Sequence, residues 1–292
     1  MLPMLERSMK MASRISSLPG IRAFSPPASV TLSEEALMYY RDCQRLAYRA
    51  AIEIAQLLQE GWTEARTAKL LETYLRDHGV KVFFHHPFVW FGERTRFDGV
   101  RNYTQYQPTR RVLHAGEVYI LDVAPILNGI TCDIGYTGSL GENLELEKAQ
   151  RFLGRLRDGI PAMFDGSRTG GEVCNELDEQ IRAEGYDNVH SMYPFSVLGH
   201  RVHDDQIERG GGMKVLNFGW QSYWSFLSRG LFGQLLNRNY SGSIHGIWAV
   251  EPHIGTKTFG AKFEELLLVG ENGARWLDET RGEAPRAEGK DK

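Results

Sequence analysis

Four acidic residues lie inside runs of apolar residues that otherwise have the composition of buried β-strands. They are Asp122, Asp133, Glu251 and Glu264. A carboxylate in such a run is costly to bury unless a cation or a group of hydrogen-bond donors meets it. For either aspartate alone, hydrogen bonds from backbone amides would be an adequate explanation. The fold must therefore bring compensating groups to four positions that are far apart in the chain.

The two aspartates belong to the clearest β-hairpin pattern in the sequence. Apolar runs at residues 117–124 and 130–136 flank an Asn-Gly pair at residues 128–129. An Asn-Gly pair between two such runs is a strong signal for a two-residue hairpin turn. Asp122 and Asp133 are thus predicted on paired strands, where both side chains can point into one space.

The remaining pattern predicts a mixed α/β chain. Helical spacing of apolar residues predicts four helices, and the first of them opens with a Thr31/Glu34 capping box. The predicted helices are residues 31–60, 63–78, 144–165 and 171–185, and the further strands are residues 80–84, 247–251 and 262–269. Residues 85–110 are predicted to be rich in loops.

Three segments differ from this pattern. Residues 1–30 are expected to form a flexible leader, with an organelle presequence as the less favoured alternative, and residues 279–292 a charged tail. Between the leader and the tail, residues 31–278 are expected to form the catalytic domain. An aromatic insertion at about residues 213–243 is read either as a lid or partner surface or as additional core packing.

Composition excludes several classes of protein. The 292 residues include 34 basic and 37 acidic ones, for a net charge of −3, and this balance argues against a nucleic-acid binder. No stretch reaches the ~18 consecutive apolar residues that a transmembrane helix needs. The three cysteines are far apart and predict neither a disulfide framework nor a zinc finger. A cytoplasmic protein is the expectation.

A histidine completes the candidate metal site. His200 follows a Leu-Gly pair and would on its own more often be structural than a ligand. Four carboxylates carry about four negative charges, which two divalent cations would balance. Carboxylates with an imidazole suit Mn, Fe, Co or Zn, and two such ions can share a hydroxide and polarise a carbonyl group.

The order Asp, Asp, His, Glu, Glu resembles that of the pita-bread metallopeptidases, which include methionine aminopeptidase, Xaa-Pro aminopeptidase, prolidase and creatinase. The resemblance extends over roughly residues 33–275. It is carried by residues 120–124 (ILDVA), 131–137 (TCDIGYT), 198–200 (LGH), 250–252 (VEP) and 263–264 (FE). The short step between the two glutamates is most similar to the Xaa-Pro branch, although only about thirty residues precede the expected catalytic unit, so a counterpart of that branch's N-terminal domain is not expected.

The resemblance implies a fold, a metal centre and an activity. The fold would be an α/β pita-bread fold with a curved antiparallel sheet backed by helices. Asp122 would chelate one ion, Asp133 and Glu264 would bridge the two ions, and His200 and Glu251 would coordinate the other. Two divalent ions are expected, with Mn favoured over Co, Fe or Zn. The substrate would be a short peptide or small molecule, and the protein a homodimer.

The sequence also departs from the family pattern. His203 follows His200 by only three residues, so it is read either as the catalytic histidine or as a substitute ligand. Proton transfer is assigned to Glu251 or His203. The histidine that usually precedes the first aspartate is missing between residues 101 and 113. Three histidines outside that interval could compensate: His85, His86 and His114.

Substrate binding is predicted at Arg101, Tyr103 and His253, the last of which replaces the usual glycine after the Glu-Pro pair. Arginines of the same loop could bind a substrate carboxylate, although for any single one of them a solvated basic loop is the better explanation. These are Arg94, Arg96, Arg101, Arg110 and Arg111.

Three functions remain open at this point. The first is a dinuclear hydrolase of peptide or small amide bonds, similar to Xaa-Pro peptidases. The second uses the same metal site for creatinase-like hydrolysis or lyase chemistry on a small non-peptide metabolite. The third is a non-catalytic binding module that holds a partner on the aromatic segment at residues 218–240.

Overall fold

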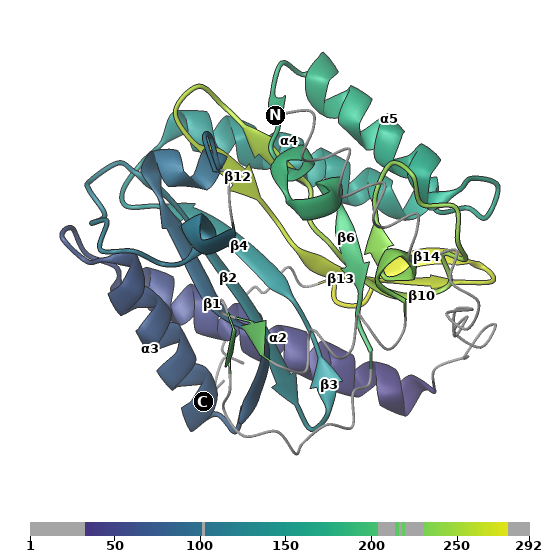
Figure 1. The fold of residues 1–292 in the computed structure, drawn as a ribbon, viewed down its shortest axis with the longest axis horizontal. Coiled ribbons are helices and arrows are strands. Elements are labelled where there is room, and N and C mark those ends of the chain that lie inside the picture. Colours follow the sequence, from purple (N-terminus) through teal and green to yellow (C-terminus); the bar gives the residue numbers. More distant parts are fainter. Residues whose placement is uncertain (1–32, 101–102, 204–213, 216–217, 220–229, 280–292) are drawn as a thin grey trace, which may run out of the picture.

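The computed structural model describes residues 33–100, 103–203, 214–215, 218–219 and 230–279. The chain forms a mixed α/β fold with antiparallel sheets and two pairs of helices (Figure 1). The predicted leader, residues 280–292 of the charged tail, and residues 213, 216–217 and 220–229 of the aromatic insertion lie outside the described residues. None of the described helices combines the length and the apolar character that a bilayer crossing requires.

The first half of the fold contains the helices α2 (Glu34–Leu57) and α3 (Glu64–Asp77). Both predicted helices are confirmed, but the cap of the first is not the predicted one. The side chain of Ser33 accepts a hydrogen bond from Ala36 N at 3.1 Å. Ser33 thus directly precedes the first helical residue, as an N-cap does.

The first sheet is ordered β3-β2-β1-β8-β7, with β4 paired to β2. Its strands are β1 (Val82–Phe91), β2 (Val118–Leu127), β3 (Ile130–Thr131), β4 (Ile134–Ser139), β7 (Lys214–Val215) and β8 (Phe218–Gly219). The prediction of a loop directly after residue 84 is wrong, because β1 continues to Phe91 and pairs with β2 along this length. The pairing shifts register on both sides of His85, and such irregularities redirect side chains.

The predicted hairpin is confirmed. β2 pairs with β3 and β4 in antiparallel register. The turn residues Asn128 and Gly129 have φ angles of 52° and 82°, the left-handed values that a two-residue turn of this kind requires.

The second half repeats the plan of two helices on an antiparallel sheet. The helices α4 (Leu144–Met163) and α5 (Gly170–Ala183) match their predicted ranges. The second sheet, in the order β14-β13-β10-β6-β9, contains β6 (Gly199–Arg201), β9 (Leu235–Leu236), β10 (Gly246–Val250), β13 (Glu265–Gly270) and β14 (Gly273–Trp276). A smaller sheet contains β5 (Asp187–Asn188), β11 (His253–Gly255) and β12 (Gly260–Lys262).

Short 3-10 helices connect these elements. They are η1 (Gly92–Arg96), η2 (Tyr103–Tyr106), η3 (His190–Met192), η4 (Pro194–Ser196) and η5 (Leu231–Gly233).

Each half has its own hydrophobic core, and the halves are joined near the candidate site. One core lies mainly between α2, α3 and the first sheet, and the other between α4, α5 and the second sheet. The backbones of Gly135 and Glu264 exchange hydrogen bonds of 3.4 and 3.2 Å. The Tyr48 hydroxyl donates to the Glu264 carbonyl oxygen at 2.9 Å. The acids of the first half thus face those of the second.

Candidate metal centre

The four acidic side chains are buried where the halves meet, and three of them occupy breaks in the strands. Asp122 lies within β2, opposite Gly135. Asp133 lies between β3 and β4, Glu251 directly follows β10, and Glu264 lies between β12 and β13. Their exposed fractions are 4%, 2%, 8% and 2% in that order along the chain. Irregular backbone at these points lets acids from different sheets turn toward one space.

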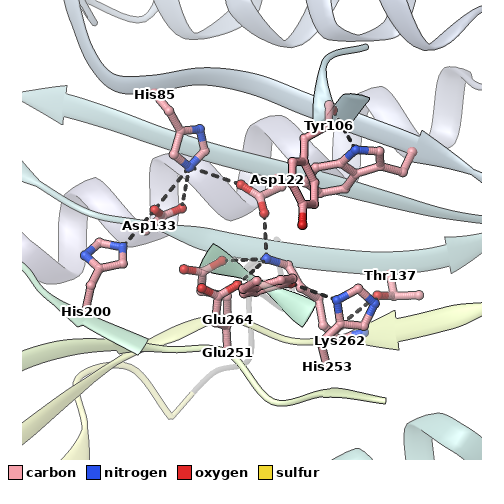
Figure 2. Close-up of polar contacts among 12 residues, drawn as sticks. His85, Tyr106, Asp122, Asp133, Thr137, His200, Glu251, His253, Lys262 and Glu264 are labelled. Carbon is pink, nitrogen blue, oxygen red and sulfur yellow. Dashed lines mark hydrogen bonds and ion pairs between the residues drawn. The ribbon is translucent and has the colours of Figure 1, made fainter. Parts of the chain in front are cut away.

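The carboxylates and two histidines form three overlapping groups whose ligand atoms lie within 4.8 Å of one another. The groups are His85/Asp122/Asp133, Asp133/His200/Glu264 and Asp122/Glu251/Glu264. Figure 2 shows these side chains converging from both sheets. All five residues predicted as metal ligands are therefore brought together, and His85 joins them.

The two histidines are oriented in the same way. Nδ1 of His85 lies 3.0 Å from the carbonyl oxygen of His86, and Nδ1 of His200 lies 3.1 Å from that of Arg201. A carbonyl only accepts, so each Nδ1 carries the proton. Each Nε2 then faces Asp133, at 3.1 Å from His85 and 3.2 Å from His200.

This orientation provides a test of whether the residues fit a metal ion. In a neutral imidazole with its proton on Nδ1, the Nε2 lone pair would point at a carboxylate, which is repulsive unless a proton or a cation lies between them. Metal-binding histidines in proteins are held in this manner, with the second nitrogen donating to a carbonyl or carboxylate. In addition, the buried Oδ1 of Asp122 has no hydrogen-bond partner among the described residues, and it lies 3.2 Å from His85 Nε2. The donor set therefore fits a divalent cation.

His200 is positioned by a close approach between strands. β6 pairs with β10, and a Cβ atom on Gly199 would collide with the carbonyl oxygen of Ala249. The glycine before His200 is thus required for packing. The His200 ring also stacks on Phe84, with 5.1 Å between the ring centroids.

A lysine reaches the same site. Lys262 Nζ donates to Asp122 Oδ2 at 2.6 Å, to Glu251 Oε2 at 2.8 Å and to Glu264 Oε2 at 2.9 Å. Its side chain is 1% exposed. Sequence reasoning included Lys262 in a strand but assigned it no role. The available signal was its spacing of two from Glu264, which places both on one face of an extended segment.

The electrostatics of the site reflect crowded negative charge. Burial raises the pKa of Glu264 well above its usual value, and Asp133 and Glu251 add to the shift. Burial also raises the pKa of Glu251, although Lys262 acts against it. Burial acts to raise the pKa of Asp133 too, but His85 and His200 outweigh it and hold that pKa below its usual value.

The pKa values of the two histidines are raised, although burial alone would lower them. Burial favours the neutral form of His85, but Asp133 and Asp122 outweigh it and raise the pKa well above the usual value. The pKa of His200 is also raised, because Asp133 outweighs burial. Protons and Lys262 thus balance the carboxylates in the protein alone, and a divalent cation would replace protons on these groups.

Other predicted site residues lie elsewhere or are not described. His203 Nε2 lies 2.6 Å from Gln234 Oε1, and His203 belongs to none of the three groups. His253 is fully buried near Lys262, with Nδ1 2.7 Å from the Tyr193 hydroxyl. Arg101 and the side chain of Tyr103 lie outside the described part of the chain.

Most of the other candidates in the preceding loop take part in ion-pair contacts within the protein. Arg94 pairs with Glu64 at 2.8 Å, Arg96 with Asp98 and Asp187, and Arg111 with Glu117 at 2.6 Å. His86 and His114 lie 3.6 Å from Glu72 and Glu60, respectively. Of the three histidines considered as compensating, His85 is the one in the metal-ligand groups.

Comparison with known families gives one match. The model of metallopeptidase family M24 matches residues 39–271, which include every residue of the candidate metal centre. No curated protein sequence matches the chain.

Several solved structures share the fold. The X-Pro aminopeptidase from Thermotoga maritima MSB8 is 19% identical, with a TM-score of 0.63, and the match covers 84% of this chain and 61% of that one. The prolidase from Pyrococcus furiosus is 18% identical, with a TM-score of 0.61 and coverage of 84% and 64%. This chain thus spans less than two thirds of either protein.

A shorter structure matches along nearly its whole length. The methionine aminopeptidase from Rickettsia prowazekii is 15% identical, with a TM-score of 0.56, and the match covers 84% of this chain and 98% of that one. At these identities the structural matches establish the fold, and they confirm the predicted pita-bread architecture.

Proposed function

This chain belongs to metallopeptidase family M24, and from that premise we propose that it hydrolyses a peptide or small amide bond with the help of divalent metal. The observation that carries the proposal is the convergence of four buried carboxylates and two histidine Nε2 atoms from both halves of the fold. The Xaa-Pro class of substrate is favoured, because proteins named X-Pro aminopeptidase and prolidase are among the structures that share the fold.

The metal would be held by the carboxylates of Asp122, Asp133, Glu251 and Glu264 and by His200. When bound, a divalent ion supplies Lewis-acid chemistry, which polarises a carbonyl group and lowers the pKa of water. Mn is the favoured ion, with Co, Fe or Zn as alternatives that suit the same ligands. Two ions are the number predicted from sequence.

Proton transfer is assigned to the Glu251 carboxylate. Its pKa is raised mainly by burial, and a carboxyl group of raised pKa is suited to accept a proton from water and return it to a leaving amine near neutral pH. His203 is disfavoured for this step, because it hydrogen-bonds Gln234 and lies in none of the ligand groups. The burial of the site excludes bulk water, which strengthens each electrostatic interaction with a substrate.

Substrate recognition is assigned to the surroundings of His253, together with Arg101 and Tyr103. Burial and the nearby Lys262 lower the pKa of His253 well below its usual value, so this ring is neutral near pH 7 and can hydrogen-bond an amide. A homodimer and a cytoplasmic location remain predictions from sequence.

The proposal is tested with purified protein loaded with Mn or Co. A panel of Xaa-Pro dipeptides, peptides with N-terminal Met and small non-peptide amides should include at least one substrate. The activity should disappear with a chelator and return with the metal. Asp133→Ala, which removes the carboxylate between the two histidines, should lose both metal and activity. A loaded protein that leaves all Xaa-Pro and Met peptides intact would refute the peptidase assignment, and activity on non-peptide amides alone would select the creatinase-like alternative.

A further inference from the structure

The position of Lys262 affects how many metal ions the site can hold. The three carboxylates that bind its ammonium group are Asp122, Glu251 and Glu264, at 2.6 to 2.9 Å. These same residues form one of the three candidate metal-ligand groups. The lysine therefore occupies the place of a cation in this group.

Packing supports this placement of the lysine. The Thr137 hydroxyl donates to the Lys262 carbonyl oxygen at 2.7 Å and accepts from the Lys262 amide at 3.0 Å, so the backbone is fixed. The aliphatic chain runs over Gly135, where a Cβ atom would collide with Cε, lie 3.3 Å from Cδ and also lie 3.2 Å from Cβ of Glu264. The absence of a side chain at residue 135 thus gives the lysine its route into the site.

An ammonium group and a metal ion cannot share this group of ligands. A divalent ion would need the carboxylate oxygens at about 2.0–2.2 Å, whereas Nζ already lies within hydrogen-bond distance of one oxygen from each of the three residues. Two positive charges in contact would also repel each other strongly in a buried site.

The ligands around Asp133 remain for a metal ion. His85 and His200 direct Nε2 toward Asp133, and Glu264 completes a group with Asp133 and His200. One divalent ion and one ammonium group together carry three positive charges against four carboxylates. We infer that this chain holds a single divalent ion around Asp133, His200, Glu264 and His85, and that the Lys262 ammonium replaces a second ion.

This inference deepens the proposed function and rests on it, since it concerns the metal content of the same site. The experiment is a count of bound Mn(II) by equilibrium dialysis and elemental analysis, together with electron paramagnetic resonance. One isolated Mn(II) ion gives a six-line spectrum, whereas two ions a few ångströms apart are magnetically coupled and broaden it. Wild-type protein should saturate at about one ion per chain with an uncoupled spectrum.

Variants at two positions test the cause. Lys262→Met, which keeps an unbranched apolar side chain but removes the terminal ammonium group, should bind about two ions and show coupling. Lys262→Arg should remain at one ion, and Lys257→Met, at an exposed lysine five residues earlier, should behave as wild type. Gly135→Ala blocks the route of the lysine, and it should also raise the count toward two without removing any charged group. Circular dichroism of each variant verifies that it is folded.

The outcomes are distinct. Two coupled ions in wild-type protein, or one ion in both Lys262→Met and Gly135→Ala, would overturn the inference while leaving a metal-dependent hydrolase intact. Failure of the proposed function would appear differently, as wild-type protein that binds no Mn(II) in the dialysis and whose hydrolytic activity does not respond to metal.

Discussion

His85 offers a sharp test of the metal centre, because an identical residue beside it serves as a control. In the substitution His85→Ala the centre loses one Nε2 atom that lies 3.1 Å from Asp133 Oδ2. Removal of an outer hydrogen-bond partner of a metal ligand weakens binding by ~10–100-fold. Loss of a ligand atom itself is expected to weaken metal binding by about 100-fold, the upper end of that range.

The effect on stability follows from mass action. At a metal concentration of ~1,000 times the wild-type dissociation constant, binding stabilises the wild-type fold by about 4.1 kcal/mol. The same concentration is ~10 times the dissociation constant of His85→Ala and stabilises it by only about 1.4 kcal/mol. The metal-induced rise in melting temperature should therefore be smaller by about 5 °C, at ~2 °C per kcal/mol, the lower end of the range for chains of about 150–250 residues, because the shift per kcal/mol falls as the chain lengthens.

The assay compares thermal unfolding with and without Mn(II) for each protein separately. Any destabilisation of the metal-free protein cancels in this comparison. The control is His86→Ala, since His86 stacks on Phe83 and lies 3.6 Å from Glu72, in none of the metal-ligand groups. It should show the wild-type rise. A metal-induced stabilisation of His85→Ala that stays within about 1 kcal/mol of the wild-type value would refute the assignment of His85 as a ligand.

Two further predictions concern buried ion pairs. Arg157 donates to Glu265, next to Glu264, through two hydrogen bonds of 2.6 and 2.5 Å. Arg157→Met should lower the free energy of unfolding by about 3–5 kcal/mol in urea denaturation, and the additional change Glu265→Gln should restore part of it; a loss below ~1 kcal/mol would contradict the reasoning. Burial acts to raise the pKa of Asp178, but His190 and Arg238 outweigh it and lower that pKa. The ionised Asp178 therefore stabilises the fold at pH values above its unfolded pKa, and this stabilisation is lost as the pH falls through its folded pKa. The loss of unfolding free energy caused by Asp178→Asn should therefore be complete at pH 7 and become smaller below about pH 4. Urea denaturation of both proteins at the two pH values measures this loss, and a loss that is independent of pH would contradict the reasoning.

Local patterns in the sequence predict the elements of the fold well, and strand ends less well. The hairpin follows from an Asn-Gly turn between apolar runs, and α3 from helical spacing that starts at Thr63 and ends before Gly79. The strand β1 was predicted too short, because Pro87 and two adjacent histidines interrupt its apolar pattern. The strand continues past them because its pairing with β2 absorbs the irregularity as register shifts around His85.

The carboxylates of the candidate metal centre could be predicted from sequence because a buried carboxylate is conspicuous in an apolar strand. His85 carried no such signal, since its place in the candidate site depends on the register shifts of β1 on either side of it, beside which its Nε2 lies 3.1 Å from Asp133. Roles that depend on irregular backbone or on distant packing are thus the ones that local patterns do not determine.

Lys262 shows this limit most clearly. Its spacing from Glu264 places it on the ligand face, but a strand lysine can equally extend toward solvent. Its path into the site depends on Gly135, which lies more than a hundred residues earlier and has no side chain to obstruct it. Four buried carboxylates require positive charge, and the sequence argument supplied that charge entirely as metal. The number of buried acids sets the positive charge that a site needs. A lysine can supply part of that charge, so the number of metal ions follows only after the cationic side chains within reach have been subtracted.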